Sequence, residues 1–180
     1  MSWYCDVAPN DPFHAPYHDG EYGFPVSDDR VLFERLSLEV FQAGLSWLLV
    51  LKKRAALNAA FADFDPVKVA AFDDTDRERL LADAGIIRNR LKIDATIENA
   101  RRLLVIQAEH GSFAAWIDTH HPLPKEDWVK LFRKTFKFMG GEVVNEFLMS
   151  TGWLPGAHRP DCPVMERIRE AGPAWGRVEG

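Results

Sequence analysis

The sequence is poor in several features that define large classes of protein. Its 180 residues contain no uninterrupted run of about 18 apolar side chains, so no segment predicts a membrane span. The first residues lack the basic and apolar pattern of a signal peptide, which predicts a cytoplasmic protein. Only two cysteines are present, and in a reducing compartment we expect them to be free, catalytic or metal-bound rather than joined in a disulfide.

An excess of positive charge is also missing. The formal net charge of −5 argues mildly against nucleic-acid binding, which usually leaves a basic surface. Acidic residues gather between Asp63 and Asp83, however, and basic residues form separate groups at 52–54, 88–92, 101–102 and 130–137. The chain can therefore present one positive face, although a solvated helix surface explains any single group equally well.

Strand-like alternation, internal repeats and low-complexity segments are absent, and signals for helix ends recur instead. Capping residues, glycines and apolar periodicity predict helices at about 28–43, 46–64, 66–71, 73–84, 89–111, 112–118, 125–136 and 142–150. The sequence thus predicts a single all-α domain spanning 1–180, with a helical core at about 27–152 and irregular ends.

The two cysteines lie at opposite ends of the chain, each near a histidine. Cys5 precedes His18 by 13 positions, and His158 precedes Cys162 by four. Two thiolates and two imidazoles form a tetrahedral Zn²⁺ site, and four protein ligands leave no position open for catalysis. Such a structural site would join segments 1–26 and 153–180. The alternative is a pair of free cysteines with incidental histidines.

A candidate nucleic-acid element lies at residues 81–92, "LADAGIIRNRLK". A helix, a turn centred on glycine and a second helix with a basic start are typical of a helix-hairpin-helix. Free amides of the turn and the start of the second helix attract a phosphate, and Arg88, Arg90 and Lys92 can add backbone contacts. An ordinary helix connection with a glycine cap is the alternative.

Glu39 occupies an unusual position in its predicted helix. Helical spacing places it on the apolar stripe with Leu32 and Leu36, where a carboxylate is costly without a polar or cationic neighbour. Two hypotheses follow: Glu39 pairs with a buried base such as an arginine, or it faces a ligand pocket.

Aromatic residues near this helix fit the pocket hypothesis. A tight corner at Gly44 and Ser46 sets Trp47 at a helix start, where its ring can border a cleft. The segment "FHAPYHDGEYG" adds His14, Tyr17 and Tyr22, whose rings either cover the core or enclose a flat ligand.

In combination these motifs resemble the bacterial DNA-3-methyladenine glycosylase I family. The similarity covers nearly the whole chain and runs in the family's order through "YHDGEYG", "LSLEVFQAGLSWLLVLKKR", "FDPVKVAAF", "DAGIIRNRLKI", "FKFMGG" and "GAHRPDC". The resemblance implies a helix-hairpin-helix glycosylase fold whose termini are joined by structural zinc. The implied metal ligands are Cys5, His18, His158 and Cys162.

The resemblance also implies an activity. A monofunctional glycosylase would flip 3-methyladenine out of alkylated double-stranded DNA, hydrolyse its N-glycosidic bond and release the free base. Such an enzyme would act as a monomer in the bacterial cytoplasm, associated with the nucleoid when on DNA. A non-catalytic protein that binds damaged DNA on the same scaffold is the alternative.

The implied site has three parts. Glu39 is the implied catalytic residue, which accepts hydrogen bonds from the flipped cationic base. The residues expected around the base are His14, Tyr17, Tyr22 and Trp47. The residues expected to contact DNA are Gly44, Leu45, Gly85, Ile86, Arg88 and Arg90, with Leu45 filling the emptied stack.

The chain departs from the family pattern at several positions. His14 replaces a tyrosine, Tyr22 and Val7 replace tryptophans, and Gly141-Glu142 stands where a small hydroxyl residue is common. Many helix-hairpin-helix glycosylases carry a catalytic aspartate about twenty residues after the hairpin. No aspartate or lysine lies at that distance here, which matches the 3-methyladenine family and predicts no strand cleavage.

Overall fold

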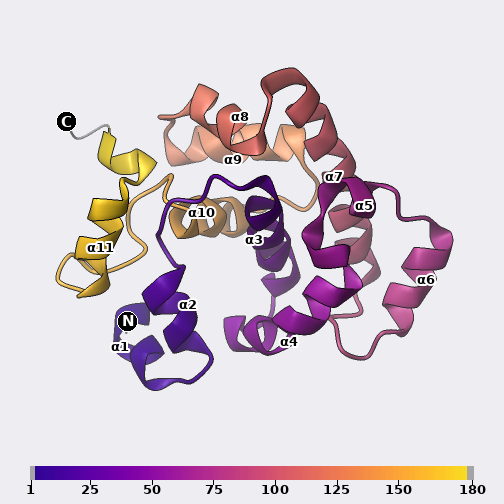
Figure 1. The fold of residues 1–180 in the computed structure, drawn as a ribbon, viewed down its shortest axis with the longest axis horizontal. Helices are drawn as coiled ribbons and strands as arrows, with labels where there is room; N and C mark the ends of the chain where they lie inside the picture. Colours follow the sequence, from indigo (N-terminus) through magenta and orange to yellow (C-terminus); the bar gives the residue numbers. More distant parts are fainter. Residues whose placement is uncertain (1–2, 178–180) are drawn as a thin grey trace.

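The computed structural model describes residues 3–177, which form helices and no strand (Figure 1). The helices of the central part are α3 (Asp29–Gln42), α4 (Trp47–Ala60), α5 (Pro66–Ala70), α6 (Asp74–Ala82), α7 (Arg90–His110), α8 (Phe113–His120), α9 (Lys125–Thr135) and α10 (Gly141–Ser150). The terminal helices are α1 (Tyr4–Val7), α2 (His14–Gly20) and α11 (Val164–Ala171), and short 3₁₀ turns lie at Ala8–Asn10, Ala62–Phe64 and Ala174–Arg177.

The predicted helix starts are confirmed by their caps. The side chains of Asp28, Ser46 and Asn89 each accept a hydrogen bond from a backbone amide three residues ahead. The helix predicted to reach residue 64 ends earlier, at Ala60, because the backbone takes positive φ angles of 51–54° at 62–64. This left-handed stretch breaks the helical ladder before the next capping residue.

The irregular ends predicted from the sequence are wrong. α1 and α2 precede the core, α11 follows it, and Figure 1 shows these three helices side by side. Each is at most eight residues long, which is too short to form alone in water. They pack in two small clusters, one of which joins Cys5 to Cys162 and Ile168, so their stability comes from contacts between opposite ends of the chain.

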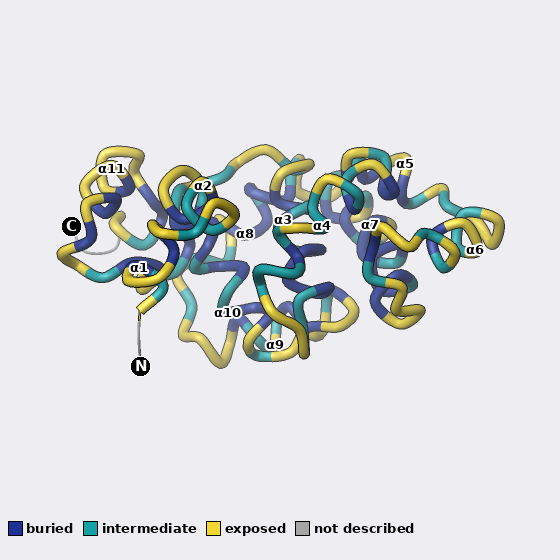
Figure 2. The backbone as a smooth tube through the Cα atoms, turned by 90° about the horizontal axis from the view of Figure 1, so that it is seen from below, coloured by how far each residue is buried: buried dark blue, intermediate teal, exposed yellow. Residues whose placement is uncertain are grey.

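The main apolar core surrounds α3, which contacts α4, α7, α8 and α10. Leu32, Leu36 and Phe41 on α3 are completely or almost completely buried. Buried backbone runs through the middle of the molecule in Figure 2, whereas α6 is largely exposed at one end. The contact of α10 with α3 brings residues more than 100 positions apart in the sequence to one place.

Gly152, which follows α10, supports this arrangement through a close backbone approach. Its φ is +84°, and a Cβ there would lie 2.9 Å from Cα of Pro25. We expect Gly152→Ala to lower the free energy of unfolding by several kcal/mol, because it adds steric overlap to the cost of positive φ. Urea denaturation measures this.

The matched control for this substitution is Gly111→Ala, with a φ of +89° and no atom within 4 Å of the added Cβ. The control should lose only about 1–2 kcal/mol. Equal losses in the two variants would contradict a packing role for Gly152.

Candidate functional site

The corner between α3 and α4, residues 43–46, forms the base of the candidate site. The amide of Leu45 donates to the carbonyl of Gln42 at 2.7 Å, and the Gln42 side chain donates back to the Leu45 carbonyl at 3.1 Å. Lys92 of α7 is buried, and its Nζ donates to the carbonyls of Phe41 and Ala43 at 2.8 and 2.6 Å. The end of α3 and the start of α4 are thereby held at a set angle.

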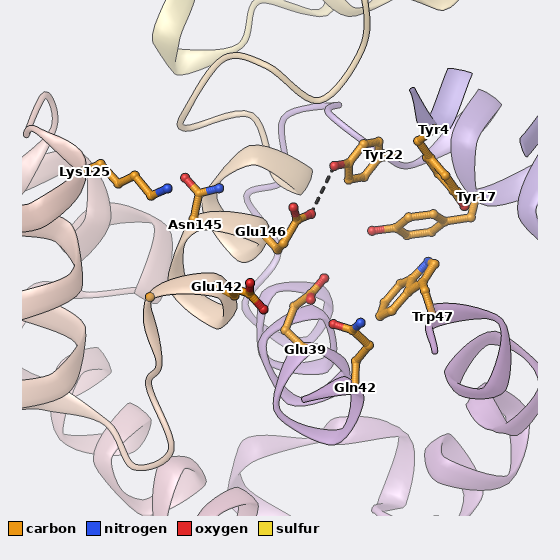
Figure 3. Close-up of a pocket in the computed structure, with 11 residues that line it drawn as sticks. Tyr4, Tyr17, Tyr22, Glu39, Gln42, Trp47, Lys125, Glu142, Asn145 and Glu146 are labelled. Atoms are coloured by element: carbon orange, nitrogen blue, oxygen red, sulfur yellow. Dashed lines mark hydrogen bonds between the residues drawn. The ribbon is translucent and has the colours of Figure 1, made fainter. Parts of the chain in front are cut away.

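Above this corner lies a cavity of about 790 Å³ between α3, α10 and the N-terminal segment (Figure 3). It is lined by Tyr4, Tyr17, Tyr22, Glu39, Gln42, Trp47, Lys125, Gly141, Glu142, Asn145 and Glu146. Aromatic rings form one side, and the acid and amide groups of α3 and α10 form the other. A flat ligand with polar edges fits this distribution.

The aromatic side consists of rings in mutual contact. The Tyr17 ring lies 5.1 Å from that of Trp47 and 5.6 Å from that of Tyr22, and Tyr4 packs edge-on against Tyr22 at 5.4 Å. The Tyr17 hydroxyl accepts a hydrogen bond from Arg35 at 3.0 Å. Burial raises the pKa of Tyr17 and of Tyr22, so both stay neutral and present an intact ring face.

Glu39 faces the cavity and is not paired with an arginine. The nearest candidate, Arg35 one helical turn earlier, donates instead to Tyr17 and to the carbonyl of Ser150. Within residues 3–177, the only carboxylate at ion-pair distance from Arg35 is that of Glu21, at 3.8 Å. The hypothesis of an arginine–glutamate pair in the core is therefore wrong, and Figure 3 shows the Glu39 carboxyl pointing into the open space.

The electrostatics of Glu39 follow from its position. It is 4% exposed, and burial together with the neighbouring carboxyl of Glu146 raises its pKa to about 8, against a smaller opposing effect of Arg35. At neutral pH the carboxyl thus holds its proton until a positive group enters the cavity. A cation there would lower the pKa and favour the ionised form.

The four expected metal ligands meet at the opposite side of the N-terminal segment. Cys5, His18, His158 and Cys162 are all buried, and one ligand atom of each lies within 4.8 Å of every other. Nδ1 of His158 is 3.5 Å from Sγ of Cys5 and 3.5 Å from Sγ of Cys162. A tetrahedral zinc with bonds of about 2.0–2.3 Å spaces its ligand atoms roughly 3.3–3.8 Å apart. The two His158 separations lie in this range, and Nε2 of His18 lies slightly beyond it, 3.9 Å from Sγ of Cys162.

Hydrogen bonds outside this terminal cluster set the histidine tautomers. Nε2 of His158 donates to the Tyr22 carbonyl at 2.6 Å, and Nδ1 of His18 lies 2.7 Å from a carboxylate oxygen of Asp19. Each imidazole thus directs its other nitrogen at the cluster, as metal-ligating histidines do. The donor set fits a structural zinc ion.

A family model described as methyladenine glycosylase matches residues 7–130 of this chain. The chain belongs to the methyladenine glycosylase family. The DNA-3-methyladenine glycosylase 1 of Escherichia coli K12 is 40% identical to it, over 88% of this chain and 94% of the relative. This confirms the resemblance seen in the motifs.

Solved structures agree with the family assignment. The crystal structure of a 3-methyladenine DNA glycosylase I matches with a TM-score of 0.80 and 38% identity, over 88% of this chain and 97% of that one. A variant of such an enzyme in complex with 3-methyladenine also matches with a TM-score of 0.80, at 33% identity, over 89% of this chain and 96% of that one. The predicted all-helical glycosylase fold is confirmed.

In this methyladenine glycosylase His14 does not line the cavity, contrary to the sequence-based expectation. Its Nδ1 lies 2.7 Å from the Tyr4 hydroxyl, and the two rings pack edge to face at 5.3 Å. Tyr4 lies between His14 and the cavity and takes the expected wall position. The sequence offered one signal for this: Tyr4 directly precedes Cys5, so any metal site that placed Cys5 would also place Tyr4.

The residues expected to contact DNA lie in two regions, the corner between α3 and α4 and the hairpin turn at 85–90. Gly44, Leu45, Gly85, Arg88 and Arg90 are exposed, with Leu45 38% accessible at the tip of the corner. Lys53 connects the two regions, since its Nζ lies 3.4 Å from the carbonyls of Ala84 and Gly85.

Two of the side chains expected at this surface are buried instead. Ile86 is only 3% exposed and packs in the main core, and Lys92 is buried under the corner, so neither side chain can reach a phosphate. The Gly85 amide donates to Asp83 at 2.8 Å, whereas the amides of Ile87 and Arg88 make no backbone hydrogen bond among the described residues. The free amides of the hairpin turn therefore lie two to three residues later than its glycine.

Several residues that line the cavity were not predicted from the sequence. Gln42 lies one turn after Glu39 on the same helix, so its position on the cavity side of α3 was predictable. Glu142, Asn145 and Glu146 share one side of α10 by their spacing, but nothing local indicates that this side meets α3. Lys125, at the start of α9, reaches the cavity through another tertiary contact, that of α9 with α10.

Proposed function

We propose that this protein is a monofunctional DNA glycosylase that hydrolyses the N-glycosidic bond of 3-methyladenine in alkylated double-stranded DNA. The observation that carries the proposal is the Glu39 carboxyl, which faces an aromatic-walled cavity without an arginine partner. Relatives of matching length are named for this activity, and one related structure holds 3-methyladenine.

The chemistry follows from the charge of the lesion. Methylation at N3 makes the base cationic and weakens its bond to C1′ of the sugar, and a damaged base unstacks more easily than a sound one. A cation in the cavity lowers the pKa of Glu39, whose proton passes to solvent, and the resulting anion accepts hydrogen bonds from the base edge. The base leaves as a neutral molecule with the electron pair of the broken bond, and water attacks C1′ of the cationic sugar and loses one proton to solvent. Strong general-acid assistance is unnecessary.

The roles of the remaining site residues are part of the proposal. Tyr17, Tyr22 and Trp47 hold the faces of the flipped base and add cation–π attraction, and Tyr4 replaces His14 in that wall. Gly44 and Leu45 form the tip that enters the DNA stack. The hairpin turn at 85–90 binds the phosphate backbone.

The terminal cluster is proposed to hold one structural Zn²⁺ through Cys5, His18, His158 and Cys162. The ion would supply no chemistry to the reaction, because its four protein ligands leave no open position. It would join segments 1–26 and 153–180 to the helical core at 27–152 in a single domain.

We propose further that the enzyme acts as a monomer in the cytoplasm. Among the described helices, none has the length and apolar character of a membrane span.

Incubation with N-methylated duplex DNA tests the activity. We expect release of free 3-methyladenine, measured by chromatography, without strand cleavage until the abasic product is treated with base. Binding to methylated DNA with no release would favour the alternative, a non-catalytic protein that recognises damage.

The hairpin turn gives a separate prediction. Arg88→Ala and Arg90→Ala should weaken binding to undamaged and methylated duplexes alike, and each should reduce the slope of log affinity against log salt by about 1, because each removes one phosphate contact. Fluorescence anisotropy at several salt concentrations measures both effects. Arg169→Ala, an exposed charge on α11, is the control. Salt slopes equal to that of the wild type would contradict the proposed contact surface.

A further inference from the structure

The side of the cavity opposite the aromatic rings carries more negative charge than one base-binding carboxylate requires. Among the described residues that line it, Glu39, Glu142 and Glu146 are acidic and Lys125 is basic. Glu146 is half-buried on α10, and Figure 3 shows its carboxyl and that of Glu39 directed into the same space.

Glu146 is held in place by Tyr22. The Tyr22 hydroxyl donates to Oε2 of Glu146 at 3.1 Å, across 124 positions of sequence. The bond joins the N-terminal segment to α10, and both residues line the cavity. Tyr22 therefore orients a second carboxylate in the cavity.

The charge of Glu146 is not neutralised by a basic residue in contact with it. Arg35 is occupied with Tyr17 and Ser150, and no ion pair reaches Glu146 among the described residues. Lys125 and Glu142 act on its pKa only through longer-range charge effects of opposite sign, while burial raises that pKa. Glu146 and Glu39 line the same cavity, and after burial the Glu146 carboxyl is the next cause of the raised pKa of Glu39.

We propose that Glu146, oriented by Tyr22, is a second recognition residue that selects positively charged purines over neutral ones. The inference rests on the proposed function, since it concerns the ligand of the same cavity. Two carboxylates attract a cationic lesion more strongly than one, whereas a neutral, undamaged adenine brings no charge to offset the cost of ionising Glu39 or of desolvating the Glu146 carboxylate. Once the bond to the sugar breaks, the neutral base loses this attraction, which favours its release.

The test compares two ligands of nearly equal shape and different charge. The 3,9-dimethyladeninium ion is a permanent cation that carries a methyl group in place of the sugar, and 9-methyladenine is its neutral counterpart. Their dissociation constants are measured by calorimetry at mildly alkaline pH. At neutral pH the loss of Glu146 would let Glu39 ionise more readily and so conceal part of the effect.

For Glu146→Gln we expect the preference for the cation over the neutral ligand to fall about tenfold, with affinity for 9-methyladenine unchanged. Tyr22→Phe should lower the preference less, and the double variant should match Glu146→Gln, because the hydroxyl acts through the carboxylate. Glu166→Gln, an exposed side chain on α11, is the control and should leave the preference unchanged.

An unchanged preference in Glu146→Gln, or an equal loss for both ligands, overturns the inference. If Tyr22→Phe lowers the preference equally with and without Glu146, the proposed action of Tyr22 through Glu146 is wrong. The two proposals fail separately: a Glu146-dependent preference without base release from DNA defeats only the glycosylase proposal. Base release with a preference independent of Glu146 defeats only this inference.

Discussion

Glu39→Gln is expected to lower the release of 3-methyladenine on the order of 10²-fold while leaving the protein as stable as the wild type or more so. Glutamine keeps the shape and a hydrogen-bonding edge but cannot become an anion when the cationic base enters the cavity. Losing one such electrostatic group typically costs this much in rate. Single-turnover release assays and thermal melts on the same preparations measure both effects.

The stability effect has a defined pH dependence. The pKa of the Glu39 carboxyl is raised from 4.5 to about 8 in the folded protein, mainly by burial and then by Glu146. Its contribution to stability is therefore fully present below about pH 4.5 and is lost as pH rises toward 8. In Glu39→Gln this loss is absent, so the variant's stability relative to the wild type should improve with pH over that window, by up to a few kcal/mol.

Glu34→Gln is the matched control on the same helix. Glu34 is paired with Arg54 at 2.7 Å, so its substitution removes a pairing partner and should lower stability while activity per folded molecule holds. If Glu39→Gln behaves in the same way, losing stability and keeping activity, Glu39 has only a structural role and the glycosylase mechanism is wrong.

Removal of the terminal metal is expected to have the largest effect on stability. Cys162→Ala should abolish binding of one zinc ion per chain and lower the free energy of unfolding by about 5 kcal/mol, the entropic value of a link that closes so long a loop. The helices at the two ends are too short to persist without that link. Elemental analysis and denaturant titration measure the two losses.

Loss of the metal should also disturb the wall of the cavity. Tyr4 adjoins Cys5, Tyr17 adjoins His18, and the Tyr22 carbonyl accepts the His158 hydrogen bond, so three wall residues depend on the cluster. We expect a strong chelator to reduce base release by the wild-type enzyme and to have no further effect on Cys162→Ala. A wild-type protein that purifies without metal and melts at the same temperature as the variant would exclude the zinc proposal.

The sequence predicted the helices of the central part because the residues that start and stop each helix lie at its ends in the sequence. A cap such as Asp28 or Ser46 and a stop such as Gly44 act over three or four positions. The same local reasoning placed Glu39 on a buried stripe. It failed at both ends of the chain, where the short helices α1, α2 and α11 form, and at Ile86 and Lys92, which tertiary contacts bury.

The sequence by itself determined where most helices begin and end, that a carboxylate lies on an apolar face, and which four side chains have the chemistry of a zinc site. Only the tertiary structure decided that α10 meets α3, so that Glu146 joins Glu39 and Tyr22 around one cavity, and that Tyr4 stands where His14 was expected. The physical reason is the range of the interactions. Backbone capping is satisfied within one turn of chain, whereas an apolar helix face packs equally well on many partners until the whole core selects one.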